Sequence, residues 1–128
     1  MAKGISNTSR TLEYLRSQGY LADKVEMWNP YSRTRKDCFG CLDIMALGEN
    51  GIIGVQSCGQ SFAAHDKKIT QDPLVAPNAL KWLECGGRLL LIGWAKRKRK
   101  LDKGWSKAEY WTPRLKWYSV EDFGKGES

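Results

Sequence analysis

Hydrophobic and polar residues alternate on both sides of a Gly-Glu-Asn-Gly segment near the middle of the chain. Alternation with period two is typical of β-strands, and Asn-Gly is a strong signal for a tight hairpin turn. The pattern therefore predicts a β-hairpin whose strands span roughly residues 39–47 and 52–58. One face of this hairpin would carry Leu42, Ile44, Ala46, Ile53 and Val55, and the other Met45, Leu47 and Ile52. Apolar residues on both faces favour a central position in a sheet.

Three polar or reactive residues, Asp43, Gln56 and Cys58, interrupt this apolar pattern. A two-residue loop at Glu49-Asn50 would place Asp43 opposite Gln56, and a loop at Asn50-Gly51 would place it opposite Cys58. In either register the three side chains share one face, whereas a three-residue loop would break that parity. A carboxylate and an amide oxygen held together suit a hard cation such as Mg²⁺. The alternative is that both residues are purely structural, Asp43 as a turn residue and Gln56 as an ordinary polar residue of the strand.

Periodicity and breaker residues predict the remaining elements. A helix over residues 8–18 precedes a strand over 21–28, which ends at Asn29-Pro30, and a basic loop over 32–37. Helices over 60–69 and 78–87, separated by prolines, lead into a strand over 88–94. The aromatic tail 105–118 reads as two strand-like pieces divided by Pro113, and 124–128 as a disordered tail. A helix that returns the chain to a further strand is typical of a βαβ unit.

Length and composition favour one globular domain. The chain has 128 residues, of which 41% are hydrophobic and 27% charged. Its apolar runs fall far short of the ~20 residues that a membrane span needs, and the start has no apolar secretory core. We therefore expect no membrane partner and a cytoplasmic location, in a bacterial or phage-infected host cell.

The positive charges are clustered, which favours an anionic partner, and DNA is the one we expect. The net charge is +7, and the clusters contain Arg33, Arg35 and Lys36, then Lys67 and Lys68, then Lys96, Arg97, Lys98 and Arg99. The run at 96–100 has three readings: phosphate contact, nuclear import, or a solvated loop. Aromatic residues at 105–118 would either stack on unpaired bases or pack internally.

The four cysteines allow a weaker alternative. Cys38 and Cys41 form a Cys-x-x-Cys, which suggests a zinc or redox module. The single histidine, His65, could complete a ligand set, but no second such pair follows, and Cys58 and Cys85 stand alone. Buried apolar thiols are the favoured reading.

The chain resembles the PD-(D/E)XK, or restriction-endonuclease-like, nuclease superfamily in the order of its predicted elements: helix, strand, hairpin, helix and strand. The segments that carry this resemblance are "FGCLDIMAL", "IIGVQSC" and then "HDKKI". The similarity is strongest to small Holliday-junction-resolvase-like and phage-encoded members. It implies an α/β fold with an αβββαβ core, a mixed central sheet flanked by helices, over about residues 8–94. Residues 95–128 would be a basic and aromatic extension of a single domain, 1–128.

The resemblance also implies a site. Asp43 matches the motif aspartate, Gln56 stands where the family has its second acid, and Cys58 stands where it has its lysine. In the family these acids bind Mg²⁺ or Mn²⁺. An amide oxygen ligates such a cation without adding charge, so a further acid is expected from Glu13 or, preferably, Glu26. Lys68, with Lys67 as alternative, would supply the missing ammonium from the following helix.

The resemblance therefore implies a metal-dependent DNA endonuclease or structure-selective resolvase, with a homodimer as the family's usual assembly. The catalytic residues would be Asp43, Gln56, Glu26 and Lys68, and the first three would hold the metal. A non-catalytic DNA-binding relative is the alternative, because neither the second acid nor the lysine is present at its motif position.

Overall fold

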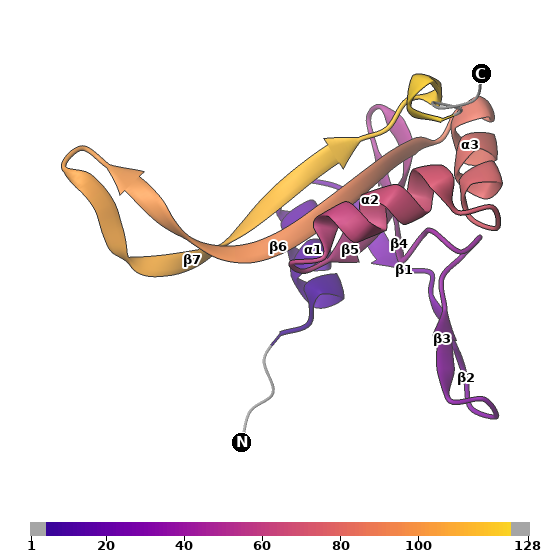
Figure 1. Cartoon of the computed structure of the whole chain (residues 1–128), viewed down its shortest axis with the longest axis horizontal. Coiled ribbons are helices and arrows are strands. Elements are labelled where there is room, and N and C mark those ends of the chain that lie inside the picture. Colours follow the sequence, from indigo (N-terminus) through magenta and orange to yellow (C-terminus); the bar gives the residue numbers. More distant parts are fainter. Residues whose placement is uncertain (1–4, 124–128) are drawn as a thin grey trace.

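The structure is a computed structural model that describes residues 5–123 (Figure 1). The elements in chain order are α1 (Asn7–Ser17), β1 (Leu21–Lys24), β2 (Met27–Asn29), β3 (Thr34–Lys36), β4 (Ile44–Gly48), β5 (Gly51–Cys58), α2 (Phe62–Gln71), α3 (Ala76–Glu84), β6 (Arg88–Leu101), β7 (Gly104–Trp117) and a short 3-10 helix, Val120–Asp122. The expected tail at 124–128 lies outside the described residues.

A five-stranded sheet in the order β1-β4-β5-β6-β7 forms the centre of the molecule. Only β5 and β6 run parallel, because α2 and α3 lie between them in the chain and return it to the same edge. One core cluster packs α1 against the sheet, and a second packs α2 and α3 against the opposite face. The predicted mixed sheet flanked by helices is thus confirmed.

Helix α1 begins and ends within a residue of the predicted bounds. The Ser6 hydroxyl accepts a hydrogen bond from the Ser9 amide at 3.1 Å and caps its first turn. Leu12 and Leu15 are buried against the sheet. The Trp94 indole on β6 donates to the buried Thr11 hydroxyl at 2.9 Å, which fixes the helix on this face.

The predicted hairpin is present as β4 and β5, and its register is the first of the two alternatives. Gly48 pairs with Gly51, so Glu49 and Asn50 form the loop, and Ile44 pairs with Val55. The first strand begins later than predicted, because Cys38–Cys41 form a turn in which Phe39 and Gly40 have positive φ. Asp43 therefore lies immediately before β4, beside the position of Gln56.

One predicted face assignment is wrong. Leu42 packs in the cluster beneath α2 and α3, whereas Ile44 and Ala46 belong to the α1 side. The alternation breaks because the chain bends at Asp43. The bend places Leu42 over Gly54, where an added Cβ would lie only 2.5 Å from Leu42 Cδ2. Glycine at this position therefore lets the side chain before the bend pack directly on the sheet.

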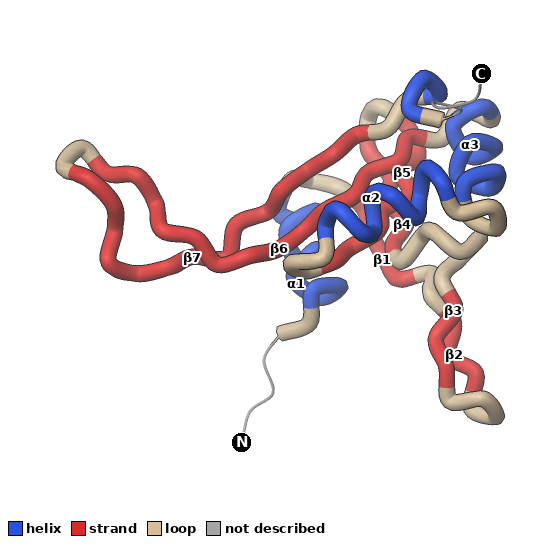
Figure 2. Tube along the Cα trace, viewed as in Figure 1, coloured by secondary structure: helices blue, strands red, loops and turns tan. Residues whose placement is uncertain are grey.

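The predicted strand over 21–28 is also divided. β1 pairs with β4 only over Leu21–Lys24, after which Val25 donates to the Asp43 carbonyl at 2.9 Å. The chain then leaves the sheet and forms a separate two-stranded hairpin, β2 and β3. Part of the expected basic loop, Thr34–Lys36, is the second strand of this hairpin. We call residues 27–36 the finger, because it projects from the body (Figure 2).

Helices α2 and α3 occupy the predicted regions with shifted bounds. Pro77 does not interrupt α3 but lies in its first turn, where a missing amide proton is tolerated. No helix in the described part of the chain is long and apolar enough to cross a membrane.

The basic run at 96–100, which lies beyond the predicted strand over 88–94, belongs to the outer half of a long strand. β6 continues through the basic run to Leu101 and pairs with β7 along its length. Pro113 does not divide β7, because β7 is an edge strand, where proline is tolerated. The hairpin extends far beyond the helices (Figure 1). We call its protruding part, residues 96–111, the arm.

The C-terminal end of β7 is joined to α2 by a polar contact. The Tyr118 hydroxyl and the Lys116 ammonium donate to the two oxygens of Asp66 at 2.7 and 3.0 Å. Burial opposes ionisation of Asp66, but these donors outweigh it and lower the pKa of the carboxyl group. Burial and the Asp66 carboxylate raise the pKa of Tyr118.

We expect Tyr118→Phe to lower the free energy of unfolding by about 1–2 kcal/mol, because a buried hydroxyl loses its bond to a charged acceptor. Urea denaturation monitored by fluorescence measures this difference. Tyr110→Phe on the arm is the control and should leave the midpoint unchanged. Equal midpoints for all three proteins would contradict the structural role of Tyr118.

Candidate functional site

Three carboxylates meet where the finger joins the sheet. Glu26 directly precedes β2, Asp37 directly follows β3, and Asp43 directly precedes β4. One oxygen from each lies within 4.8 Å of the others. Asp43 is only 6% exposed, and its Oδ2 accepts the Ser57 amide of β5 at 2.9 Å. The bend at Asp43 thus turns the carboxylate across the hairpin and fixes it on a rigid strand.

Gln56 joins this cluster from β5. Its Nε2 donates to Asp37 Oδ2 at 3.0 Å, while its Oε1 is buried without a hydrogen-bond partner. The residue is only 4% exposed, so water does not readily satisfy that oxygen. A buried acceptor left unpaired costs roughly 1–3 kcal/mol. The predicted proximity of Asp43, Gln56 and Glu26 is therefore present, and Asp37 is an additional member.

The donor set consists entirely of oxygen atoms. Carboxylates and an amide carbonyl are the ligands that Mg²⁺, Ca²⁺ and Mn²⁺ prefer, whereas zinc sites favour nitrogen and sulfur. The orphaned Oε1 belongs to the amide that contacts Asp37, so it lies at the edge of the same cluster. These residues fit a hard divalent cation.

Crowding of the carboxylates changes the titration of Asp43. Burial, a hydrogen bond shared with Asp37 and the negative charges of Asp37 and Glu26 raise the pKa of Asp43 to about 8, against the opposing effect of the Ser57 amide. The shift favours the protonated form of Asp43 in the protein without metal. A bound cation would have to displace that proton.

We expect the stability of the metal-free protein to fall as pH rises. A carboxyl group whose pKa increases on folding contributes stability that is full below its unfolded value of 3.8 and is lost as pH rises through about 8. Thermal unfolding in EDTA, followed from about pH 4 to about pH 9, tests this. Asp43→Asn is the matched control, because the amide keeps an acceptor for Ser57 but does not titrate.

The difference in Tm between Asp43→Asn and the wild-type protein should therefore widen toward alkaline pH. Adding Mg²⁺ or Mn²⁺ should narrow it, since the cation replaces the proton. A difference that does not vary with pH would show that Asp43 ionises normally.

The position of the family's lysine holds the buried thiol of Cys58. Burial and the Asp43 charge raise the pKa of Cys58, while Arg114 on β7 acts in the opposite direction. Lys68 is exposed on α2, and its positive charge opposes the rise in the pKa of Cys41 that burial causes. Lys68 thus acts on Cys41 and Arg114 on Cys58, and neither cation makes a direct contact with the acidic cluster in the described structure.

Two further candidates lie elsewhere. Glu13 is on α1 and lines a hollow with Arg10, Trp94 and Trp111, so it does not join the acidic cluster. Lys67 is exposed on α2 beside Lys68, at the rim of a shallow hollow.

In the described residues, Cys38 and Cys41 are not joined by a third ligand-type side chain close enough to share an ion. Among the described residues, the acidic cluster is the only group of three ligand-type side chains close enough to share an ion, and it contains no cysteine. All four cysteines are free thiols. Burial raises the pKa of Cys41 to about 12, which is the opposite of what a reactive redox thiol requires.

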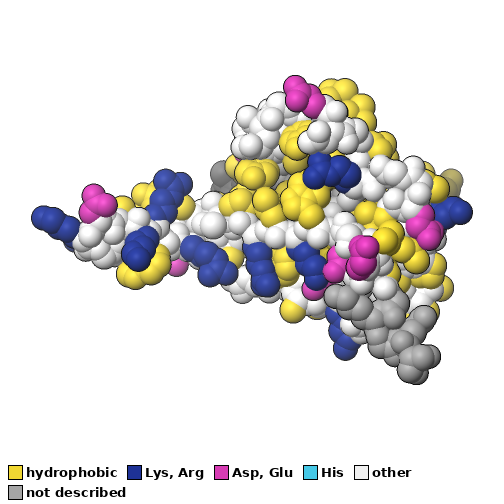
Figure 3. Space-filling view, turned by 90° about the horizontal axis from the view of Figure 1, so that it is seen from above, with side chains coloured by type: hydrophobic (Ala, Val, Ile, Leu, Met, Phe, Trp, Pro, Cys, Tyr) yellow, Lys and Arg dark blue, Asp and Glu magenta, His cyan; other side chains and the backbone are white. Residues whose placement is uncertain are grey.

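The basic run lies on the arm. Lys and Arg side chains follow the arm toward the body in the space-filling view (Figure 3). Lys96 is paired with Trp111 and Arg97 with Tyr110, so lysines and arginines at successive positions point to opposite faces. Two aromatic rings of the arm are already covered by arginines, Trp111 by Arg10 and Tyr110 by Arg99, each at 3.8 Å.

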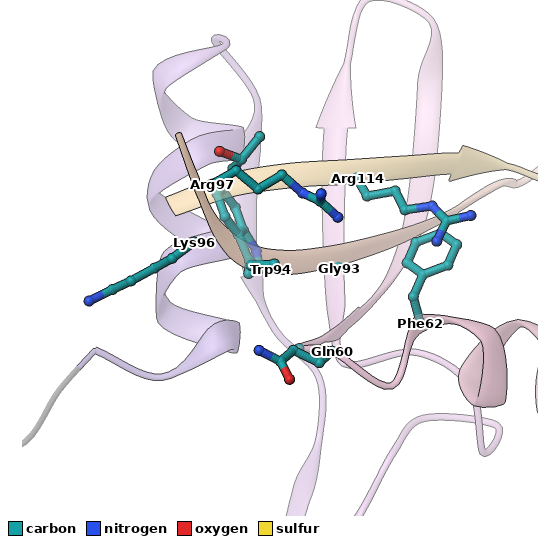
Figure 4. Close-up of a pocket in the computed structure, with 10 residues that line it drawn as sticks. Gln60, Phe62, Gly93, Trp94, Lys96, Arg97 and Arg114 are labelled. Carbon is teal, nitrogen blue, oxygen red and sulfur yellow. The ribbon is translucent and has the colours of Figure 1, made fainter. Parts of the chain in front are cut away.

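A cavity of about 270 Å³ lies at the base of the arm. Gln60, Arg97 and Arg114 contribute polar groups to it, whereas Lys96 points away (Figure 4). Arg114 lies over the Phe62 ring at 4.1 Å. Gly93 makes this packing feasible, because a Cβ there would lie 2.6 Å from the Phe62 ring. The cavity thus presents two guanidinium groups, which suit a phosphate.

Sequence reasoning missed Asp37 and Arg114. Asp37 stood at the end of a supposed basic loop, although an acid so close before Asp43 in a turn-rich segment was the available signal. Arg114 lies more than fifty residues from Gln56 in the sequence, so only the pairing of β7 with β6 brings it near.

Comparisons with protein-family models, with curated proteins and with solved structures gave no match to this chain.

Proposed function

We propose that this protein is a metal-dependent DNA endonuclease of the PD-(D/E)XK type, with a variant site. The observation that carries the proposal is the cluster of Glu26, Asp37 and Asp43 beside the unsatisfied oxygen of Gln56. The mixed five-stranded sheet with helices on both faces supports the proposal at the level of the fold class. Mg²⁺, or Mn²⁺, is the proposed cofactor.

Each residue has a defined part in this proposal. Asp43, Asp37 and Glu26 would hold the cation with Gln56 Oε1, and the three negative charges would offset the charge lost by replacing the motif acid with glutamine. When bound, the cation lowers the pKa of water and stabilises charge on the phosphate. Lys68 and Arg114 would attract the scissile phosphate toward the cluster.

The basic surfaces would hold the DNA. Arg97 and Arg114 at the base of the arm and the exposed Lys67 and Lys68 on α2 offer phosphate contacts. Contacts of this kind fix the position of DNA without reading its sequence. The chain would therefore act on DNA structure more than on a base sequence.

A cleavage assay on supercoiled, linear, single-stranded and four-way-junction DNA, with Mg²⁺, Mn²⁺ or EDTA, tests the proposal. Cleavage that requires the cation is the expected result. DNA binding without turnover would favour the non-catalytic relative, which the buried thiol at the lysine position supports. Stoichiometric zinc in the purified protein would favour the cysteine-based module instead.

A further inference from the structure

The finger is the second projection of the molecule, after the arm, and its base lies at the acidic cluster. Its strands pair over Met27–Asn29 and Thr34–Lys36. Glu26 immediately precedes the first strand and Asp37 immediately follows the second. The two chain segments that join the finger to the body at its base therefore each carry a carboxylate of the cluster. Arg35 on the finger lies 3.7 Å from Glu26. Anything bound along the finger is thus held beside the proposed metal centre.

Two large aromatic side chains are displayed on the finger. Tyr31 at the tip is 97% exposed and Trp28 on β2 is 58% exposed. Among the described residues, neither ring takes part in a ring–ring or cation–ring contact, unlike Trp111 and Tyr110 of the arm. Both rings are therefore free to stack on a flat partner.

The tip has a defined shape. Asn29 Oδ1 accepts the amides of Tyr31 and Ser32 at 2.9 and 3.3 Å, and the hydroxyls of Ser32 and Thr34 are 2.7 Å apart. Arg33 completes the turn with a φ of 56°. An aromatic side chain displayed on a fixed turn loses less conformational entropy on binding than one on a loose loop.

The charge of the finger points to an anionic partner. Residues 27–36 include three basic side chains, Arg33, Arg35 and Lys36, and no acidic one. Exposed rings interleaved with cations are the combination used to bind single-stranded nucleic acid, in which bases stack on the rings while the phosphates meet the charges. A paired duplex offers no such unstacked base.

We propose that the finger binds unpaired nucleotides of DNA, with bases stacked on Trp28 and Tyr31 and phosphates against Arg33 and Arg35, since Arg35 lies opposite Trp28 on the same face of the hairpin. The inference rests on the proposed function, because it names the substrate class of that site: DNA in which single-stranded segments adjoin a duplex. The unpaired strand would then pass directly beside Glu26, Asp37 and Asp43.

The test measures binding in EDTA, so that it does not depend on cleavage. Fluorescence anisotropy gives Kd for a duplex, and for the same duplex with a single-stranded flap that contains 2-aminopurine. In the wild-type protein, we expect stacking to quench the 2-aminopurine. Trp28→Ala with Tyr31→Ala should raise Kd for the flapped DNA by roughly tenfold per ring and abolish the quenching. Kd for the plain duplex should change little.

Two controls sharpen the result. Trp28→Phe with Tyr31→Phe keeps the rings and should retain most of the binding and quenching. Trp105→Ala removes a ring that is 65% exposed on the arm and should leave the preference for flapped DNA unchanged. The alanine double variant should unfold at the wild-type temperature, because neither ring belongs to a core cluster.

An unchanged Kd ratio in the alanine double variant would overturn the inference. The inference would also be overturned if the alanine double variant bound DNA normally but no longer self-associated in sedimentation. That result would show that the finger binds a second copy of the chain. Failure of the proposed function gives a different result. If the wild-type protein shows ring-dependent binding and quenching but no cation-dependent cleavage, the role of the finger is supported and the nuclease activity is not.

Discussion

Replacing Asp43 by Asn is expected to abolish cation-dependent cleavage of DNA. Asp43 is the most buried carboxylate of the cluster and is fixed by the Ser57 amide, so its substitution removes the best-positioned ligand. Loss of several kcal/mol of metal-derived stabilisation corresponds to a rate that falls roughly a thousandfold or more. Single-turnover cleavage at saturating DNA, measured over a range of Mn²⁺ concentrations, gives this rate.

The isosteric change should not harm the fold. An asparagine keeps the hydrogen bond from Ser57 and relieves repulsion from Asp37 and Glu26, so Tm in EDTA should equal or exceed that of the wild-type protein. Glu13→Gln removes a carboxylate outside the cluster and should cleave at the wild-type rate. If the Asp43→Asn variant cleaved DNA at the wild-type rate, the assignment of Asp43 as a metal ligand would be wrong.

Gln56→Glu extends the same experiment. A fourth carboxylate would bind the cation more tightly, so cleavage should be preserved or raised and should saturate at a lower Mg²⁺ concentration. In EDTA the added charge, together with the lost hydrogen bond to Asp37, should lower Tm. If Gln56 is a metal ligand, the substitution should favour cleavage when metal is present and lower Tm when it is absent. A polar strand residue without a role in metal binding would not show these opposite effects.

Removing the charges at the base of the arm is expected to weaken DNA binding and flatten its dependence on salt. Lys96, Arg97 and Lys98 lie on the part of β6 that leaves the body, and Arg97 lines the basal cavity. If each contacts a phosphate, each change to Ala reduces the log–log salt slope by about 0.9 on duplex DNA. Affinity measured at several salt concentrations gives the slope.

The matched control preserves charge. Lys96→Arg, Arg97→Lys and Lys98→Arg together should keep the slope, since counterion release depends on charge more than on side-chain shape. Cleavage by the alanine triple variant at saturating DNA should survive, because none of the three belongs to the acidic cluster. An unchanged slope would make Arg33, Arg35, Lys36, Lys67 and Lys68 the preferred DNA-facing residues.

Features that depend only on neighbouring residues could be predicted before the fold was known. Period-two alternation and the turn chemistry around Asn50 were sufficient to predict the hairpin and to place Asp43 and Gln56 on one face. Helical periodicity and breaker residues placed the first helix within a residue of its observed bounds. Both signals act over a few residues, so they are readable without the rest of the chain.

The tertiary structure decided whatever depends on distant segments. The bend at Asp43 redirects Leu42 to the other face. The chain leaves the sheet after Lys24 and returns after the finger, which brings Glu26 and Asp37 together at the base of the finger. The basic run became a strand because β7 pairs with it. Strand pairing across long separations is set by the packing of the whole domain, and local propensity does not encode it. Asp37 and Arg114 were missed for that reason.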